Sequence, residues 1–310
     1  MFKIGLLIPT LNAGKAWEIL LQKVDLQELD IVQKIIIDSG SSDNTVDLAV
    51  KHGFEILKIS KNDFDHGYAR QLLADAANKC EILIYLTQDS ILKDKDTFNE
   101  LIKAFSDPTV GIAYGRQLPR LGAKVLETHG RLFNYPGKSL VKKLDDKSTL
   151  GIKTASCSNS FAAYRKSALM DVGGFPSNTI FAEDVIVGGK MLINGWKIAY
   201  VANSEVYHSH DYSTIEEFKR YFDIGVYHST NHWLLDEFGK ADGEGLKYLK
   251  SEFVYVLKNN ILVLPKMLAS IGAKFFGYKL GMMHERLTLN QKKRFSMHRK
   301  YWDKVITNKI

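Results

Sequence analysis

The sequence predicts an α/β fold with a mixed, mostly parallel sheet and helices on both faces. The run 82–87 (ILIYLT) is short, apolar and bounded by polar residues, as a fully buried strand would be. Upstream of it, strand-like runs alternate with amphipathic helical stretches. Such alternation pairs parallel strands through right-handed crossovers. The 310 residues suffice for one large domain or two modest ones.

The first part of the chain contains five expected strands and four expected helices. Each strand is a short apolar run, and each helix has apolar residues at helical spacing. The expected strands are 3–9, 31–37, 54–59, 82–87 and 110–114. The expected helices are 16–26, 43–52, 68–78 and 96–105, the second of them capped by Asp43.

The second part of the chain is expected to be less regular. Residues 119–153 lack apolar periodicity and contain several glycines and prolines, which predicts a long, partly mobile loop. A small-residue strand is expected at 156–164, followed by a turn at 173–176 (GGFP), a helix from 183 to 194 and a strand at 197–206.

Polar side chains gather where the predicted parallel strands end. Thr10 and Asn12 follow the first strand, Asp38 ends the second, and Asp89 follows the run 82–87. Ligands of open α/β sheets bind outside these carboxyl ends, so these residues predict one binding rim. The first strand does not open a G-x-G-x-x-G turn, which disfavours a dinucleotide-binding dehydrogenase.

These motifs resemble glycosyltransferase family 2 of the GT-A fold over about the first 210 residues. The matching pattern is PTxN at 9–12, IDSGSxD at 37–43 and a strand that ends at Asp89. Further stretches resemble more closely the bacterial O-antigen rhamnosyltransferases that use dTDP-L-rhamnose, and this likeness runs almost to the C-terminus. They are DFDHG at 63–67, LTQDS at 86–90, GRQLP at 115–119, SNSFAAYR at 158–165 and HSH at 208–210.

The resemblance implies a donor site for a nucleotide sugar. Its residues would be Pro9, Thr10, Asn12, Asp38, Ser39, Gly67, Arg70, Gln88, Asp89, Arg116 and Asn159. Two of these keep an alternative interpretation. Arg70 also fits a surface position on an amphipathic helix, and Arg116 also fits a solvated loop.

A divalent cation, Mg²⁺ or Mn²⁺, is implied at Asp89. Many family members carry Asp-x-Asp at this strand end, whereas this chain has Gln88-Asp89-Ser90. Mg²⁺ commonly uses only one or two carboxylates beside phosphates and water. His208 and His210 alternate along an extended segment, so both rings face one side and are candidate metal ligands. The alternative for this pair is two hydrogen-bonded loop histidines.

The catalytic candidates are the adjacent acids Glu183 and Asp184. Acids at a helix start are also stabilised by the helix dipole, which is the simpler explanation when they are taken alone. The resemblance matches Asp184 to the catalytic base of the family. Inverting transfer needs a carboxylate that takes the proton of the attacking hydroxyl. Glu183 would orient the acceptor or cap the helix.

The C-terminal part of the chain is basic and amphipathic. Residues 243–310 contain 14 Lys and Arg against four Asp and Glu, although the whole chain has a net charge of only +7. Two helical apolar stripes, at 246–257 and 261–280, carry lysines beside them. This pattern predicts peripheral attachment to the cytoplasmic face of a bacterial membrane rather than nucleic-acid binding. No uninterrupted apolar run reaches 18 residues, so no spanning helix is expected.

The sequence thus predicts a catalytic domain at 1–242, with a donor half at about 1–116 and an acceptor half at about 117–242, and a membrane-associating tail at 243–310. The predicted activity is inverting transfer of L-rhamnose from dTDP-β-L-rhamnose to a polyprenyl-diphosphate-linked O-antigen or surface-polysaccharide intermediate. Two alternatives stay open: a non-catalytic module that binds nucleotide sugars, and a nucleotidyltransferase.

Overall fold

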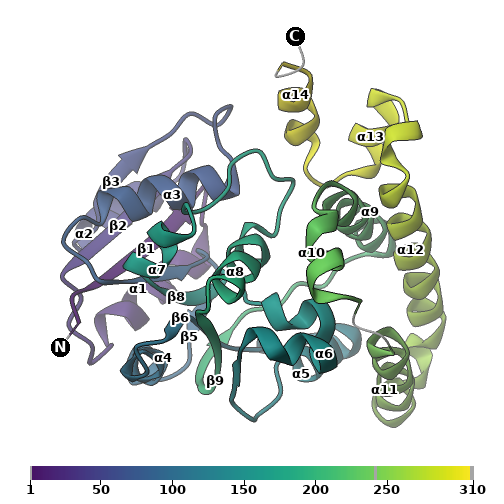
Figure 1. The fold of residues 1–310 in the computed structure, drawn as a ribbon, viewed down its shortest axis with the longest axis horizontal. Helices are drawn as coiled ribbons and strands as arrows, with labels where there is room; N and C mark the ends of the chain where they lie inside the picture. The colour runs from purple at the N-terminus through teal and green to yellow at the C-terminus, as the bar shows by residue number, and fades with distance from the viewer. Residues whose placement is uncertain (1, 241–242, 308–310) are drawn as a thin grey trace.

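A nine-stranded mixed sheet forms the centre of the molecule (Figure 1). The computed structural model describes residues 2–240 and 243–307. The strand order is β3-β2-β1-β4-β8-β6-β9-β5, and β7 pairs with β9 beside this path. The strands are β1 (Ile4–Thr10), β2 (Gln33–Asp38), β3 (Glu55–Lys58), β4 (Ile82–Leu86), β5 (Ile91–Leu92), β6 (Val110–Leu118), β7 (Leu140–Lys142), β8 (Phe161–Arg165) and β9 (Lys197–Tyr207).

The N-terminal half of the sheet is parallel, as the alternating pattern predicts. β1 pairs in parallel with both β2 and β4, and β2 pairs in parallel with β3. The register sets Thr10 opposite Asp38, so the polar residues that end β1 and β2 lie side by side. Further along the sheet, β8 runs antiparallel between β4 and β6, and β6 pairs in parallel with β9.

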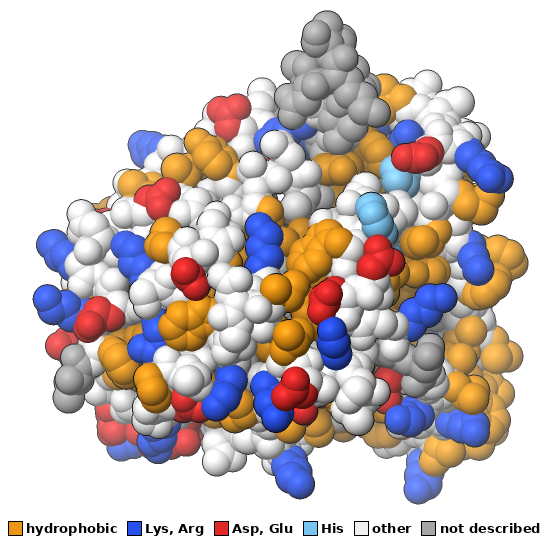
Figure 2. Space-filling model, in the orientation of Figure 1, with side chains coloured by type: hydrophobic (Ala, Val, Ile, Leu, Met, Phe, Trp, Pro, Cys, Tyr) orange, Lys and Arg blue, Asp and Glu red, His pale blue; other side chains and the backbone are white. Residues whose placement is uncertain are grey.

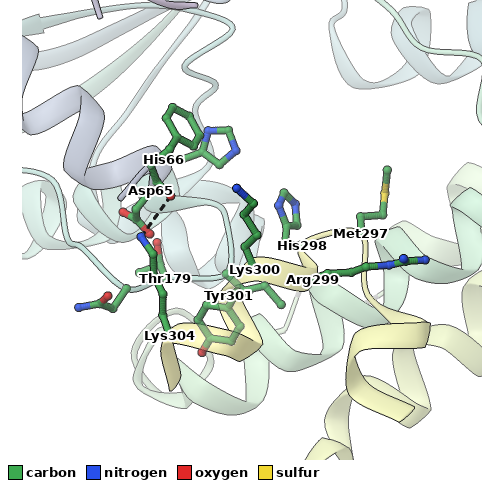
Figure 3. A pocket seen from close by; sticks show the side chains of 12 residues that line it. Asp65, His66, Thr179, Met297, His298, Arg299, Lys300, Tyr301 and Lys304 are labelled. Carbon is green, nitrogen blue, oxygen red and sulfur yellow. Dashed lines mark hydrogen bonds between the residues drawn. The ribbon is translucent and has the colours of Figure 1, made fainter. Parts of the chain in front are cut away.

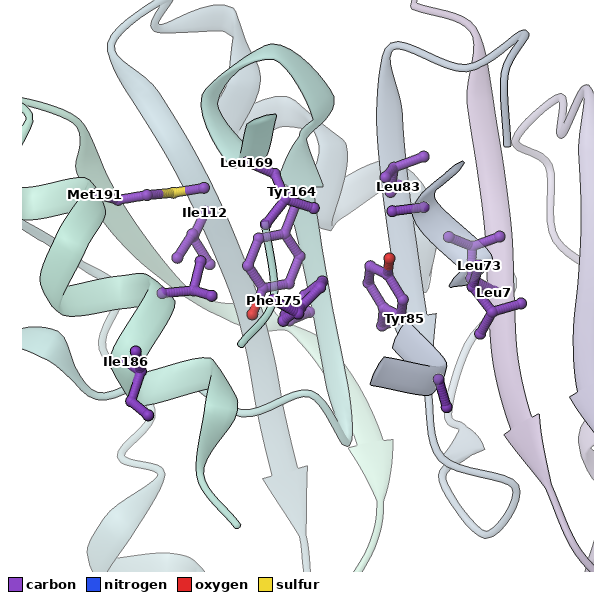
Figure 4. Close-up of a cluster of buried hydrophobic side chains, with 14 of the residues drawn as sticks. Leu7, Leu73, Leu83, Tyr85, Ile112, Tyr164, Leu169, Phe175, Ile186 and Met191 are labelled. Atoms are coloured by element: carbon purple, nitrogen blue, oxygen red, sulfur yellow. The ribbon is translucent and has the colours of Figure 1, made fainter. Parts of the chain in front are cut away.

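Helices cover both faces of this sheet, and each face has its own apolar core. One core joins the sheet to α1 (Lys15–Asp25), α2 (Thr45–Lys51) and α4 (Thr97–Ile102). The other joins it to α3 (His66–Ala76), α7 (Lys166–Asp171) and α8 (Glu183–Ile193), and Figure 4 shows its tyrosines and branched side chains packed together. The predicted α/β architecture is therefore confirmed.

Two local expectations need correction. Asn44, not Asp43, is the N-cap of α2, although the Asp43 carboxylate accepts hydrogen bonds from the backbone and hydroxyl of Thr45. Residues 119–153 are not a long loop, because they contain α5 (Val125–Asn134), β7 and α6 (Lys147–Leu150). Glu127 closes a capping box at the start of α5 and also accepts a hydrogen bond from the distant Ser209.

The remaining helices follow β9. They are α9 (Thr214–Thr230), α10 (His232–Phe238), α11 (Glu244–Asn259), α12 (Leu264–Met282), α13 (Leu289–Phe295) and α14 (Arg299–Thr307). In Figure 1, α9 and α12 lie side by side. Gly277 and Gly281 of α12 face backbone carbonyls of α9 so closely that any Cβ would overlap them.

By length and composition alone, the segment Ile261–Met282 could cross a membrane. The expectation that no such segment exists is therefore corrected. That expectation considered only uninterrupted apolar runs. Lys266 and Lys274 interrupt the apolar run of this segment. Only 17% of the segment is buried, on the side that packs against α9.

Residues 298–304 contact the segment before α3 and the residues before α8. The side chains of Lys300 and Lys304 donate hydrogen bonds to backbone carbonyls of Lys61 and Asp63, before α3. His298 stacks on Phe181, two residues before Glu183, with ring centroids 6.3 Å apart. Figure 3 shows these tail side chains beside Asp65 and His66 of the α3 start.

Candidate active site

Asp89, His208 and His210 converge at one edge of the sheet. Asp89 follows β4, and both histidines follow β9, which the short strand β5 joins to the Asp89 turn. The Asp89 carboxylate lies 3.5 Å from Nε2 of His208 and 3.9 Å from Nε2 of His210. One potential ligand atom from each residue lies within 4.8 Å of the others. The structure therefore brings together the three residues that the sequence predicts as metal ligands.

A neighbouring hydrogen-bond chain fixes the orientation of His208. Arg131 donates to Oε1 of Gln117 over 2.7 Å, and since a guanidinium only donates, this bond defines the amide orientation. Nδ1 of His208 lies 2.9 Å from the same oxygen and must therefore carry a proton. This directs Nδ1 of His208 to Gln117 and leaves Nε2 facing Asp89, as in metal-binding histidines whose other nitrogen is held by an outer partner.

The charge state of this cluster suits a cation. Burial, and next the neighbouring His208, lower the pKa of His210 to about 4, so His210 is neutral at pH 7. Burial tends to raise the pKa of Asp89, but hydrogen bonding and charge from His208 outweigh it and lower that pKa below its usual range. One carboxylate and two imidazoles fit Mn²⁺ and related ions, with room for phosphate oxygens as further ligands.

The acids Glu183 and Asp184 begin α8, directly after a residue with unusual backbone geometry. Ala182 has φ 59° and ψ 35°, a left-handed conformation that is rare for residues other than glycine. The Asp184 carboxylate accepts hydrogen bonds from the backbone N–H groups of Asn159, at 3.0 Å, and of Val185, at 2.9 Å. Burial, and next the charge of Glu183, raise the pKa of Asp184 to about 7. A carboxyl group with this pKa can accept a proton near neutral pH.

Glu183 is buried and held by two residues that the sequence assigns to the donor. Arg70 pairs with its carboxylate over 2.7 Å, and the Asn159 amide donates to the same oxygen over 2.9 Å. Burial alone would raise the pKa of Glu183, but Arg70 and then His66 outweigh it and lower the pKa. Arg70 is thus not a surface residue, and its bond to Glu183 holds α3 against α8.

A continuous series of contacts joins the metal cluster to the acids. Asp89 contacts His208, which bonds to Gln117, and the Gln117 amide donates to the Ser158 hydroxyl over 2.8 Å. The next residue, Asn159, bonds to both acids. Asp89 and Asp184 are therefore parts of one polar network rather than of separate regions.

The rim residues of β1 and β2 are tied to one another. The Asp38 carboxylate accepts from the Thr10 hydroxyl and from the backbone N–H groups of Gly40 and Ser41. Ser39 donates both its N–H and its hydroxyl to the Thr10 carbonyl. Asn12 has φ 45°, and its side-chain oxygen accepts from the N–H of Ser42. The predicted rim is therefore present, as a pre-formed loop pair.

The other predicted donor residues have clear structural partners. Pro9 lies in β1 opposite Ile37. The Gln88 amide makes two hydrogen bonds with the backbone of Leu11, which closes the rim beside Asp89.

Gly67 and Arg116 both have packing roles. Gly67 packs against the Pro176 carbonyl with no space for a Cβ, so its contact in this structure is α3 against the 173–176 turn. Arg116 pairs with Glu205 and donates to the Tyr135 carbonyl, which makes it an internal brace rather than a solvated loop residue.

Several residues of the network were missed by the sequence analysis. Gln117, Arg131 and Ser158 orient His208, and Tyr164 donates to Asn159 over 2.7 Å. Gln117 and Ser158 fall within stretches that carry the family resemblance, which was the available signal. Arg131 lies in the region that was expected to be a loop, so no pattern pointed to it.

Known proteins share this architecture. The O-antigen chain rhamnosyltransferase RfbN from Salmonella typhimurium is 45% identical over 304 residues, which are 98% of this chain and 97% of that protein. The O-antigen chain rhamnosyltransferase WbaN from Salmonella anatum is 42% identical and covers 97% of this chain and 96% of its own.

Among solved structures, the mannosyltransferase PcManGT from Pyrobaculum calidifontis in complex with GDP-Man and Mn²⁺ has a TM-score of 0.58 at 17% identity, covering 99% of this chain and 86% of that one. Residues 1–349 of S. aureus TarS give 0.53 at 14% identity, covering 99% and 92%. These two likenesses show the GT-A-like fold. The model of glycosyl transferase family 2 matches residues 6–173. The chain belongs to glycosyltransferase family 2.

Proposed function

We propose that this glycosyltransferase transfers L-rhamnose from dTDP-β-L-rhamnose, with inversion, to an O-antigen intermediate. The two Salmonella relatives support the sugar and the pathway, since both are named O-antigen chain rhamnosyltransferases. The observation that carries the proposal is the network between Asp89 and Asp184. It joins a cation-binding set to a carboxyl group whose pKa is about 7.

In the proposed reaction, Asp184 takes the proton of the acceptor hydroxyl as its oxygen attacks the anomeric carbon. The bond from that carbon to the diphosphate breaks, and dTDP leaves from the opposite side. A positioned base of this kind contributes roughly 10²–10⁴-fold to the rate. Asn159 orients Asp184, and burial together with the charge of Glu183 keeps the pKa of Asp184 high. A divalent cation held by Asp89, His208 and His210 would neutralise charge on the diphosphate.

The donor nucleotide is assigned to the rim built by the ends of β1 and β2. Thr10, Asn12, Asp38 and Ser39 form this rim, and Gln88 connects it to Asp89. Arg70 and Asn159 hold Glu183, and Gly67 packs α3 against the 173–176 turn. In this proposal the donor half is about 1–116, the acceptor half is about 117–242, and residues from 243 onward form the helical tail.

We further propose that the tail attaches the enzyme to the cytoplasmic surface of the membrane, where a polyprenyl-diphosphate-linked acceptor would lie. The outer side of α11, the 3₁₀ turn Ile261–Val263 and α12 is apolar, and part of it is seen at the right edge of Figure 2. Its most exposed large side chains are Leu246, Phe253, Val254, Leu257, Ile261, Leu262, Leu268, Phe275 and Phe276. Lysines 250, 258 and 279 lie among them and would face anionic lipid headgroups.

Peripheral attachment fits α12 better than a membrane-spanning position. Gly277 and Gly281 pack on the backbone of α9, and Lys274 pairs with Glu217 of α9. If α12 crossed a membrane, it would lose these contacts with α9.

Vesicle flotation tests the attachment. The double variant Leu262→Glu, Phe276→Glu is expected to stay unbound with anionic vesicles that float the natural protein. The matched control is Leu121→Glu. The Leu121 side chain is 90% exposed and lies outside α11 and α12. Equal flotation of all three proteins would refute a membrane role for this face.

A donor panel tests the activity. The purified enzyme, a divalent cation and an acceptor extract are incubated with dTDP-L-rhamnose, UDP-glucose, GDP-mannose or dTDP-glucose, and the released nucleoside diphosphate is measured. We expect release from dTDP-L-rhamnose and incorporation of rhamnose into lipid. Release of pyrophosphate from a nucleoside triphosphate would instead indicate a nucleotidyltransferase, and release from another donor alone would overturn the sugar assignment.

A further inference from the structure

A cavity lined in part by His210 lies between α5 and the helices that follow β9. It measures about 630 Å³ and is enclosed by α5, α9, α11 and α12. His210 and Ser156 line its inner end. His210 belongs to the metal cluster, and Ser156 lies three residues before Asn159, which holds Asp184. The cavity therefore opens at the reaction centre.

The cavity wall has the chemistry of a carbohydrate site. Five aromatic side chains line it, contributed by four helices and the segment after β9: Phe133, Tyr212, Tyr221, Tyr248 and Phe275. Aromatic ring faces offer flat apolar surface to the C–H groups of a sugar, while acids on the same wall accept from its hydroxyls.

One acid on this wall has unused hydrogen-bonding capacity. Glu217 lies on α9, and its Oε1 is 3.6 Å from Nζ of Lys274. Its Oε2 is buried and has no hydrogen-bond partner within the described part of the chain. A buried acceptor without a donor is costly, so this oxygen is suited to a ligand hydroxyl.

The other end of the cavity meets the exposed apolar side of α12. Ile271 and Phe275 line the cavity, and the Phe275 ring contacts Phe276 at 5.5 Å between centroids. Phe276 and Leu268 are exposed on the same helix, at 63% and 58%. A ligand with a saccharide in the cavity would therefore have a route for a lipid chain along α12.

We propose that this cavity binds the saccharide of the acceptor, and that the acceptor lipid leaves over Phe275 onto the apolar side of α12. This inference rests on the proposed function and adds the acceptor subsite. The proposed nucleotide rim follows β1 and β2, and the cavity is reached from His210 after β9, with β4, β8 and β6 between them in the sheet order, so the donor nucleotide and the acceptor occupy different parts of the sheet edge.

A matched pair of glycine variants tests the subsite. Gly245 of α11 lines the cavity, and a Cβ there meets no atom within 4 Å, so Gly245→Phe fills the cavity without a backbone clash. Gly272 of α12 has the same free space but does not line the cavity, and Gly272→Phe is the control. A second pair is Glu217→Gln, at the unpartnered oxygen, and Asp236→Asn, on the exposed side of α10.

Two measurements separate this proposal from the proposed activity. The first is calorimetric binding of farnesyl diphosphate-linked hexoses, which needs no turnover. We expect Gly245→Phe and Glu217→Gln to bind them about tenfold more weakly, with dTDP binding and both controls unchanged. The second is the acceptor KM, which should rise by the same factor at constant donor KM. Equal binding by all five proteins, or no binding to the natural protein, would overturn the acceptor site. If the natural protein bound the farnesyl diphosphate-linked hexoses and Gly245→Phe weakened that binding, but no turnover was detected, only the proposed rhamnosyl transfer would be overturned.

Discussion

The backbone N–H of Asn159 donates to Oδ2 of Asp184 over 3.0 Å. The side-chain amide of the same residue donates to Glu183 over 2.9 Å, and Tyr164 of β8 donates to its oxygen. Asn159 thus holds both acids from the segment that enters the central strand β8. The position of Asp184 is therefore set by the sheet, although Asp184 itself begins a helix after a strained residue.

Replacing Asp184 by Asn tests its role as base. We expect kcat to fall by roughly 10²–10⁴-fold, because the amide cannot take the hydroxyl proton. Binding of dTDP should not change. Because the pKa of Asp184 is raised from 3.8 to about 7 by folding, folding free energy is lost as the pH rises between these values and the loss stays constant above about 7, so the variant should melt no lower than the natural protein at pH 8. Retained turnover, measured as dTDP release, would remove Asp184 from the mechanism.

The pH dependence of turnover follows from the same carboxyl group. The base must be ionised, so kcat/KM should rise with pH and level off above about 7. The charge of Glu183 contributes to the raised pKa, so Glu183→Gln should move the midpoint to lower pH. Rate profiles from pH 5 to 9 at saturating cation check both expectations. A natural enzyme with a flat profile, or a variant whose midpoint moves upward, would contradict this origin of the pKa.

The sequence analysis was most informative about the polar residues that directly follow a strand. The family resemblance implied Asp89, His208 and His210 as metal ligands, and their alternation along an extended segment placed the two histidine rings on one side. The helices and strands of residues 3–118 also appear close to their predicted ranges, since their apolar periodicity is regular.

Partners far apart in the chain could not be predicted in this way. Arg70 pairs with Glu183 across 113 positions, and Arg116 pairs with Glu205 across 89. Nothing near either arginine specifies these acids. Helix α5 was missed for a related reason. The buried residue of α5 is His129, and Glu127, which caps the helix, also accepts a hydrogen bond from Ser209. Polar contacts with distant residues therefore support this helix, whereas the sequence analysis looked for an apolar stripe.

Gln117 should control metal affinity without touching the metal. Replacing it with Met removes the acceptor that fixes the Nδ1 proton of His208, so Nε2 would no longer be the defined ligand atom. Losses of about 10–100-fold in affinity are typical of such outer partners. Titration with Mn²⁺ measures the affinity, and Gln22→Met, at an exposed position of α1, is the control. Unchanged Mn²⁺ affinity in the Gln117 variant would show that the tautomer is set elsewhere.

Gly67 should be required for stability rather than for donor contact. A Cβ at this position would overlap the Pro176 carbonyl, so Gly67→Ala must separate α3 from the 173–176 turn. We expect a loss of about 1–3 kcal/mol in the free energy of unfolding, the usual cost of overpacking. Gly245→Ala, in a helix with free space, should instead gain roughly 0.5–1 kcal/mol. Denaturant unfolding of both variants gives the comparison. If Gly67→Ala matched the natural protein in stability but bound dTDP more weakly, Gly67 would belong to the donor site after all.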